Sequence, residues 1–177
     1  MIFAGPIVAK GASVSDSRFL SHPFLPVFDS DSTRLILGSF PSVKAVEEGF
    51  YYANPANRFY AVLSGLFGVD FTQANWQQKQ ALFLQNHIAL HDVIGSCRIV
   101  GSSDSTIEDV VPANLEFLLN QSSIRHIYCN GQRAYDEYRR FFSRISIPVT
   151  LLPSTSPANA RMRVPDLIRA WSVLLND

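Results

Sequence analysis

The residues best suited to chemistry follow short apolar segments of the sequence. Asp92 ends the segment HIALHD, and Asn130 ends the segment HIYCN. Two longer segments, 38–59 and 152–163, also follow apolar runs and are rich in Gly, Ser, Asn and Pro. In an open parallel sheet, ligands bind where the carboxyl ends of the strands release such loops. We therefore expect these four loops to converge on one site.

Two of the loops carry groups that could bind a nucleobase and its phosphates. The amide of Asn130 offers a donor and an acceptor to a base edge, or else it caps the next helix. The hydroxyls at 154–156, which lie between two prolines, suit phosphate contacts. The alternative for that segment is an ordinary turn bounded by proline.

The segment 38–59 is long for a connection in a compact domain, and such loops are usually functional. Three adjacent aromatic residues, Phe50, Tyr51 and Tyr52, lie within it. They could stack on a nucleobase or plug the loop onto the hydrophobic core. The sequence leaves both roles open for each of the three.

The acidic residues near the second loop allow a metal site but do not require one. Asp92 lies at a strand end, whereas Asp104, Glu108 and Asp109 are interpreted as cap and first-turn charges of a helix. The four histidines have no metal-binding spacing, and P-loop, GxGxxG and GxSxG motifs are absent. Two cysteines, Cys97 and Cys129, are too few for a thiolate-bound cluster and are expected to be buried thiols. We therefore expect neither a metal nor a cofactor.

The order of apolar and amphipathic segments predicts an α/β fold. Expected strands cover 34–40, 87–95, 124–131 and 147–157, and expected helices cover 57–68, 76–87, 111–121, 132–145 and 164–175. Alternation of this kind gives βαβ units and a mainly parallel sheet. Residues 1–24 are expected to form an irregular N-terminal arm, and residues 25–177 a single domain.

Composition fits a globular protein and leaves the partner open. Hydrophobic residues make up 47% of the 177, charged residues 17%, and the net charge is zero. A nucleic-acid partner usually requires a basic surface, but eight arginines lie between 125 and 169 and could form a basic face. The sequence has no apolar run long enough to cross a membrane and no signal-peptide pattern at its start. We expect a cytoplasmic monomer without a membrane partner.

Four segments, taken in order, resemble the motif regions of the uracil-DNA glycosylase superfamily. They are LILGSFPSVKAVEEGFYYANPANRFYAVL, IALHDVIGSCRIVGSSDSTI, IYCNGQRAY and LLPSTSPANA. The likeness extends from about residue 25 to the end. It is closest to the hypoxanthine (deoxyinosine)-DNA glycosylases, and next to the mismatch-specific uracil and thymine glycosylases.

This resemblance implies a three-layer α/β/α sandwich around a four-stranded, mainly parallel sheet. It also implies a monofunctional enzyme of base excision repair that acts on single- or double-stranded DNA. Such an enzyme flips a deaminated base (hypoxanthine, uracil or xanthine) out of the DNA. It then hydrolyses the N-glycosidic bond of that base.

The resemblance also suggests roles for individual residues. Asn57 would hold the attacking water, backbone N–H groups near Gly38 and Ser39 would stabilise the departing base, and Asp92 would lie near the developing positive charge. The expected base-binding residues are Phe50 as first choice of stacking wall, Tyr51 as second, Phe40 and Asn130. The expected DNA-binding residues are Ser42, Ser154, Thr155, Ser156, Asn159 and Arg161.

Several positions depart from the patterns of the superfamily. Phe40 stands where the mismatch-specific enzymes have an asparagine, and Tyr60 and His91 stand where tryptophan is expected. Pro153 precedes Ser154 where other branches have a histidine. These departures bear on the range of substrates more than on the reaction.

Two other functions are compatible with the sequence. A small α/β hydrolase could hold a divalent metal with Asp92, Asp104 and Glu108, and a chelator would then inactivate it. A non-catalytic module could bind damaged or single-stranded DNA without releasing a base.

Overall fold

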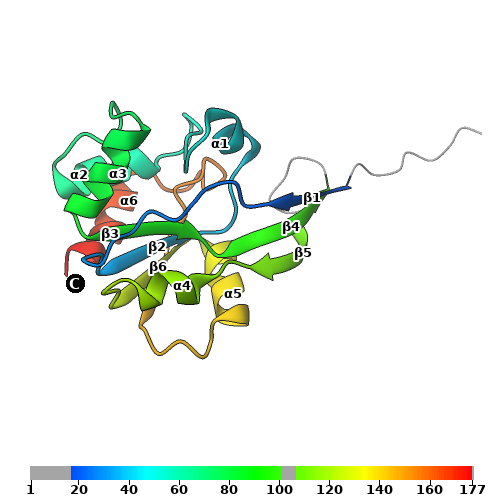
Figure 1. Cartoon of the computed structure of the whole chain (residues 1–177). Coiled ribbons are helices and arrows are strands. Elements are labelled where there is room, and N and C mark those ends of the chain that lie inside the picture. Colours follow the sequence, from blue (N-terminus) through cyan, green and yellow to red (C-terminus); the bar gives the residue numbers. More distant parts are fainter. Residues whose placement is uncertain (1–16, 101–106, 177) are drawn as a thin grey trace, which may run out of the picture.

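The central element of the fold is a four-stranded sheet. The computed structural model describes residues 17–100 and 107–176. Strands β2 (Arg34–Gly38), β3 (Ile88–Asp92), β6 (His126–Asn130) and β7 (Val149–Leu152) lie in the order β3-β2-β6-β7 (Figure 1). Each neighbouring pair is parallel. The sheet thus confirms the predicted fold class.

Helices cover both faces of this sheet and form the other two layers (Figure 1). Ile36 packs in a core cluster with helices α2 (Phe59–Phe67), α3 (Trp76–Gln85) and α6 (Val164–Trp171), which the 3-10 helix η2 (Ser172–Leu175) follows. Leu35 and Leu37 belong to a second cluster with α4 (Leu115–Asn120) and α5 (Gln132–Phe141). Successive strand residues point to opposite faces, and both faces are covered, so these strands are apolar throughout.

The strand register brings the four polar loops to one edge of the sheet. Gly38 pairs with Asp92, and Asn130 pairs with Leu152. The strands therefore end at the same level, as the sequence predicted. The first of these loops contains a short helix, α1 (Val43–Glu48), where the sequence predicted only a loop. The Ser42 side chain caps α1 by accepting from the N–H of Ala45.

A second, antiparallel sheet was not expected from the sequence. It consists of β1 (Ser17–Ser21), β4 (Ile94–Val100) and β5 (Ile107–Pro112), in the order β1-β4-β5. The prediction that Glu108 and Asp109 begin a helix is therefore wrong, because both lie in β5. Ile107, Val110 and Val111 favour a strand there, and Cys97 of β4 and Ile107 of β5 pack into the second core cluster. Asp104 lies outside the described residues.

Strand β1 falls in the segment for which the sequence predicted irregular structure; residues 1–16 of that segment lie outside the described residues. This part of the chain runs along the free edge of β3. The N–H of His22 donates to the carbonyl of Gly95, and Val27 exchanges two backbone hydrogen bonds with Leu90. Edge strands need such cover, which short-range sequence patterns do not reveal.

Helices in the described ranges are not of the length and apolar character needed to cross a membrane.

Candidate active site

A cavity of about 280 Å³ opens at the sheet edge where the parallel strands end. Residues of the loops that follow β2 and β7 line it, together with the last residues of β3 and β6, so all four strand ends meet there as predicted. Its lining consists of Gly38, Ser39, Phe40, Pro41, Ser42, Ala45, Tyr51, Tyr52, Asn54, Asn57, Asp92, Asn130, Ser154, Thr155, Ser156 and Pro157. Of the residues predicted for the site, Phe50, Asn159 and Arg161 are not part of this lining.

Thr155 links the two asparagines of the cavity. Its backbone N–H donates to Oδ1 of Asn130 at 3.0 Å, and its hydroxyl accepts from Nδ2 of Asn130 at 3.0 Å. The same hydroxyl donates to Oδ1 of Asn57 at 2.9 Å. Thr155 is fully buried. Thr155 therefore leaves one N–H and one oxygen lone pair of Asn130 without a bond to it, fewer groups than the sequence suggested.

The carbonyl oxygen of Asn57 is already occupied by two donors. It accepts from the hydroxyl of Thr155 at 2.9 Å and from the N–H of Phe59 at 3.0 Å, where α2 begins. The amide assignment follows from this network. The group that Asn57 can offer to a water or a sugar in the cavity is thus its NH₂, which donates.

Arg58 organises the loop that carries the hydroxyls. Its guanidinium donates to the carbonyls of Thr155, Ser156, Asn159 and Met162. The Asn159 side chain donates to the carbonyl of Ser154 at 2.9 Å, so it shapes the loop from within. Arg161 is exposed on the same loop.

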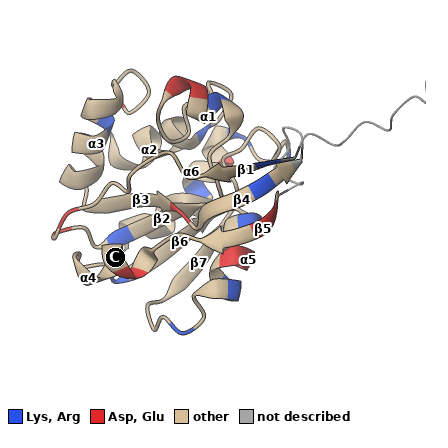
Figure 2. Ribbon diagram, turned by 45° about the vertical axis from the view of Figure 1, so that its right-hand side comes forward, with Lys and Arg blue, Asp and Glu red and all other residues tan. Residues whose placement is uncertain are grey.

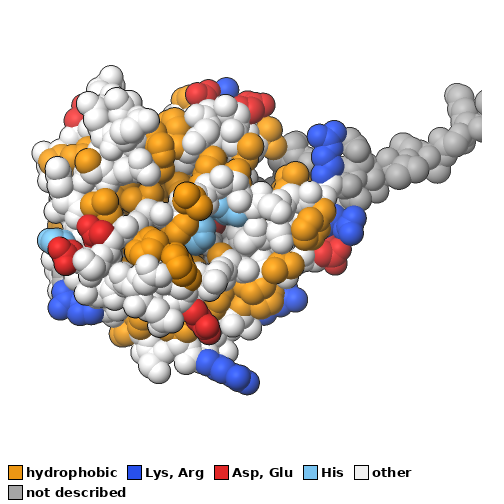
Figure 3. Space-filling view, viewed as in Figure 1, with side chains coloured by type: hydrophobic (Ala, Val, Ile, Leu, Met, Phe, Trp, Pro, Cys, Tyr) orange, Lys and Arg blue, Asp and Glu red, His pale blue; other side chains and the backbone are white. Residues whose placement is uncertain are grey.

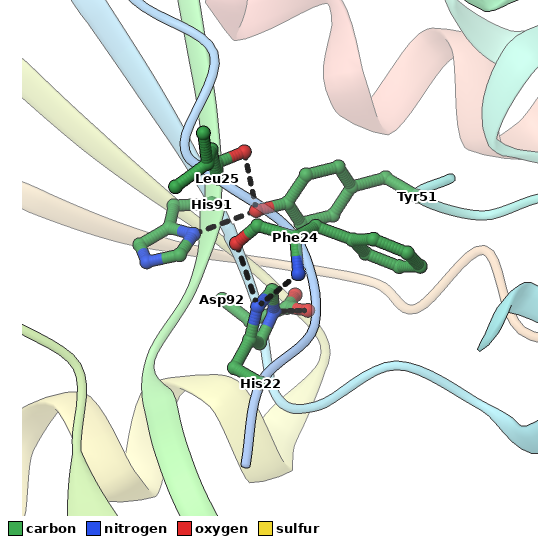
Figure 4. Close-up of polar contacts among 6 residues, drawn as sticks. All are labelled: His22, Phe24, Leu25, Tyr51, His91 and Asp92. Atoms are coloured by element: carbon green, nitrogen blue, oxygen red, sulfur yellow. Dashed lines mark hydrogen bonds and ion pairs between the residues drawn. The ribbon is translucent and has the colours of Figure 1, made fainter. Parts of the chain in front are cut away.

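Asp92 is buried at the end of β3 and is held by a residue that the sequence did not single out. Its Oδ2 lies 2.8 Å from Nε2 of His22, and both side chains are 5% exposed (Figure 4). Burial, and to a smaller extent the negative charge of Asp92, raises the pKa of Tyr51 and of Tyr52 far above the usual range. Both phenols are therefore neutral donors at physiological pH.

A second histidine lies beside this pair and is neutral. Burial lowers the pKa of His91 to about 4, although Asp92 acts in the opposite direction. Nδ1 of His91 lies 2.7 Å from the hydroxyl of Tyr51, and that hydroxyl donates to the carbonyl of Leu25 (Figure 4). The Tyr51 hydroxyl is thus used for packing, while other atoms of the residue line the cavity.

Gly38 allows the strand end to approach Asp92 closely. A Cβ at Gly38 would lie 2.1 Å from Oδ1 of Asp92 and 2.6 Å from the hydroxyl of Tyr52. Tyr52 itself has a φ of 54°, an unfavourable value for a tyrosine. Its ring stacks on Phe59 at a centroid distance of 3.9 Å. Backbone strain of this kind tends to occur at functional sites, and it marks Tyr52 as a wall of the cavity that sequence reasoning did not choose.

Phe50 does not occupy the place that the sequence assigned to it. Its ring stacks on Trp76 at a centroid distance of 5.5 Å, and the ammonium of Lys79 lies 5.5 Å from the ring centroid. This packing holds the residue against the core, away from the cavity. The aromatic lining comes instead from Phe40, Tyr51 and Tyr52.

Two backbone N–H groups at the cavity are available as donors. Ser39 and Phe40 follow the last residue of β2, and neither N–H donates to another residue in the described ranges. The carbonyls of Gly38 and Ser39, in contrast, accept from Val93 and Ile94. The carbonyls of Gly38 and Ser39 thus anchor the end of β2, whereas the N–H groups of Ser39 and Phe40 remain unpaired among the described residues.

Within residues 17–100 and 107–176, no three His, Cys, Asp or Glu side chains gather in a way that could hold a metal ion. Glu108 is exposed on β5. Asp104, the third residue of the metal alternative, lies outside the described residues.

A family model described as the uracil DNA glycosylase superfamily matches residues 25–175. The chain belongs to this superfamily. Two curated proteins named hypoxanthine DNA glycosylase are similar to it. The one from Methanosarcina barkeri is 29% identical over 78% of this chain and 87% of its own length. The one from Methanosarcina acetivorans is 30% identical over the same shares.

A solved structure supports the same relationship with the uracil-DNA glycosylase superfamily. It is the solution NMR structure of a protein from Methanosarcina acetivorans that is provisionally named a uracil DNA glycosylase. The match has a TM-score of 0.75 and 28% identity, and it covers 89% of this chain and 99% of the other. The predicted family, the fold and the assignment as a DNA glycosylase are confirmed at this level.

Proposed function

We propose that this glycosylase flips a deaminated base into the cavity and hydrolyses its N-glycosidic bond without a cofactor. Hypoxanthine is the first expected substrate, followed by uracil and xanthine. One observation carries the proposal: Asn57, Asp92, Ser39 and Phe40 line the same cavity, and the N–H groups of Ser39 and Phe40 donate to no other described residue. All of these come from one chain, so the enzyme is proposed to act as a monomer.

The cavity walls suit a planar base. Phe40, Tyr51 and Tyr52 provide aromatic surface, and stacking on such surfaces is worth about 1–3 kcal/mol per base. The base must first leave the helix, at a cost of a few kcal/mol that is lowest for a mispair. Deaminated bases form mispairs, so this step already favours them.

Selection among bases would rest on Asn130 and the backbone donors. Hypoxanthine and uracil both present an N–H next to a carbonyl, which matches the lone pair and the N–H that Thr155 leaves free on Asn130. Adenine lacks this pair of groups and would leave buried polar atoms unpaired, a penalty of about 1–3 kcal/mol. The name of the Methanosarcina relatives, hypoxanthine DNA glycosylase, agrees with this choice.

The chemical step separates positive from negative charge, and different groups of the cavity would stabilise each of the two charges. As the glycosidic bond breaks, its electron pair leaves with the base, and positive charge develops on the sugar. The N–H groups of Ser39 and Phe40 would stabilise the base anion, as in an oxyanion hole. The carboxylate of Asp92 would stabilise the sugar cation and accept a proton as water bonds to the sugar carbon. The NH₂ of Asn57 would position that water.

Contacts with the DNA backbone are assigned to hydroxyls at the cavity rim. Ser42 and Ser154 use their oxygens to accept backbone N–H groups, which leaves both hydroxyl protons free to donate to phosphates. Ser156 has the same arrangement. Asn159 and Arg161 complete the loop that would enter the minor groove, and Thr155 supports it from beneath.

The test is base release from labelled duplexes that carry hypoxanthine, uracil or xanthine, with alkali used to cut abasic sites. We expect strand breaks at hypoxanthine, with equal rates in the presence of EDTA. Inactivation by EDTA would favour the metal-dependent hydrolase. DNA binding without strand breaks on any duplex would favour the non-catalytic module.

Asn57→Ala refines the same test. It should slow single-turnover base release far more than it weakens DNA binding, because the residue is assigned to water placement. Asn114→Ala is the matched control, since Asn114 caps α4 on the other face of the sheet. Equal losses of rate and affinity in Asn57→Ala would contradict the assigned role.

A further inference from the structure

We propose that His22, in the N-terminal part of the chain, is a positioning residue for Asp92 and thereby a part of the active site. This inference rests on the proposed function, in which Asp92 faces the sugar. His22 precedes the residues matched by the family model, which begin at 25. Through His22, this part of the chain would then contribute to catalysis in addition to covering the sheet edge.

The backbone fixes His22 beside Asp92 from both directions. On one side, β1 pairs with β4, and the N–H of His22 donates to the carbonyl of Gly95 at 2.8 Å. On the other side, Val27 is bound to Leu90 by two hydrogen bonds of 2.9 and 2.8 Å. Asp92 lies between Leu90 and Gly95 in sequence. The segment from β1 to Val27 therefore crosses the end of β3 and places His22 next to Asp92, the last residue of that strand.

The hydrogen bonds of the imidazole define its role. Nε2 faces a carboxylate oxygen, which only accepts, so Nε2 carries a proton and donates. Nδ1 lies 3.0 Å from the carbonyl of Phe24 and 3.2 Å from the N–H of the same residue. Neutral His22 accepts from that N–H, and protonated His22 donates to that carbonyl. The ring therefore keeps its place and its bond to Asp92 in either state.

Aromatic packing restricts the ring further. His22 makes edge contacts with Phe24, Phe40 and His91 at centroid distances of 5.7, 5.8 and 4.9 Å. Phe40 also lines the cavity, so the imidazole lies directly behind one of its walls. Figure 3 shows histidine side chains among hydrophobic ones near the centre of the face across which this segment runs.

This arrangement determines which carboxylate oxygen faces the substrate. His22 holds Oδ2, while Oδ1 is the atom nearest to a Cβ built at Gly38, at the cavity. His91 does not compete for the carboxylate, because burial keeps it neutral and Tyr51 binds its Nδ1. A carboxylate that is already fixed toward a developing cation stabilises it more than a mobile one, because it need not reorient during the reaction.

The experiment compares two substitutions of His22 in the full chain. His22→Phe keeps the ring shape but removes the donor, and His22→Gln keeps an N–H near the position of Nε2. We expect His22→Phe to slow single-turnover release of hypoxanthine by about tenfold or more, a loss in the range seen for misplaced catalytic groups, with the Kd for DNA unchanged. His22→Gln should recover most of the rate. Leu25→Ala, which removes an exposed side chain from the same segment, is the control and should match the unaltered chain.

A double-mutant cycle with Asp92→Asn separates positioning from general packing. If His22 acts through Asp92, the double variant His22→Phe/Asp92→Asn should be no slower than Asp92→Asn alone. Rates that multiply, or a His22→Phe variant as fast as the unaltered chain, would overturn the inference. If His22→Phe fails to fold, His22→Met replaces it as the variant without a donor. His22→Gln should then release the base faster than His22→Met, and equal rates would overturn the inference. Absence of base release by the unaltered chain would instead overturn the proposed function, and this inference with it.

Discussion

Gly38→Ala is a sharp test of the site, because it adds a single carbon where Asp92, Tyr52 and the end of β2 meet. The new Cβ would lie 2.1 Å from Oδ1 of Asp92, whereas a carbon and an oxygen in contact are normally separated by about 3.3 Å. The carboxylate must therefore move by about 1 Å, and the Tyr52 hydroxyl by somewhat less. His22 holds the other carboxylate oxygen, so rotation of Asp92 also breaks that bond.

The magnitude follows from this displacement. A shift of about 1 Å in a catalytic group can reduce the rate by about 100-fold, which is roughly 2.7 kcal/mol in the barrier. The fold should survive, since overpacking of this kind costs about 1–3 kcal/mol. We therefore expect a folded protein with DNA affinity close to that of the unaltered chain and about 100-fold slower base release.

The assay is single-turnover release of hypoxanthine with enzyme in excess, together with the Tm of each variant. Gly65→Ala is the matched control. A Cβ there would lie 2.4 Å from Cδ1 of Ile168, a comparable overlap with the end of a flexible side chain, in α2 and outside the cavity lining. A folded Gly38→Ala variant with the rate of the unaltered chain would refute the assigned place of Asp92. Equal slowing in both variants would indicate a general effect of packing.

Three further predictions concern residues around the cavity. Thr155→Val should slow base release by at least about tenfold, because it removes the hydroxyl that links the two asparagines. It should also lower the free energy of unfolding by about 1–3 kcal/mol, because the buried Nδ2 of Asn130 loses its acceptor. Thr155→Ser should behave as the unaltered chain does, and an unchanged rate of base release in Thr155→Val would show that catalysis does not need this link. Arg58→Lys should speed tryptic cleavage at Arg161, because an ammonium cannot bind the four loop carbonyls that the guanidinium binds. Unchanged cleavage kinetics would argue against an anchoring role for Arg58. The pKa of His91 is about 4 in the folded chain and about 6.5 in the unfolded chain, so between these pH values protonation favours unfolding. The free energy of unfolding measured in urea should therefore decrease by up to about 3 kcal/mol as the pH falls from about 6.5 to about 4. In His91→Phe this slope should be absent, and an equal slope would mean that other groups cause it.

The parallel sheet and the convergence of its loops could be predicted because both depend on local patterns. Strands buried on both faces are continuously apolar, as in Leu35, Ile36 and Leu37, and parallel strands release their loops at one edge. Asp92 and Asn130 were placed correctly at the cavity for this reason. The prolines and hydroxyl residues of segment 152–163 likewise predict a polar loop at this edge.

Features that depend on contacts distant in sequence could not be predicted. The sequence predicts an irregular arm, because residues 11–26 mix Gly, Ser and Pro with scattered aromatic residues, and only pairing with β4 and β3 orders the described part of it. Phe50 was preferred to Tyr52 as the stacking wall because residue type does not reveal the direction of a side chain. In the folded chain, Tyr52 lines the cavity with a positive φ, whereas Phe50 stacks on Trp76.

The coordination of Arg58 by four carbonyls has an electrostatic consequence for DNA binding. A peptide group whose oxygen turns inward presents the positive end of its dipole outward, and here the half-buried guanidinium of Arg58 adds to that field. Basic and acidic residues are otherwise dispersed over the ribbon in the view of Figure 2, and the net charge is zero. Attraction of a polyanion by dipoles displaces few counterions, in contrast to attraction by lysine and arginine side chains. The affinity of this chain for DNA should accordingly depend only weakly on ionic strength.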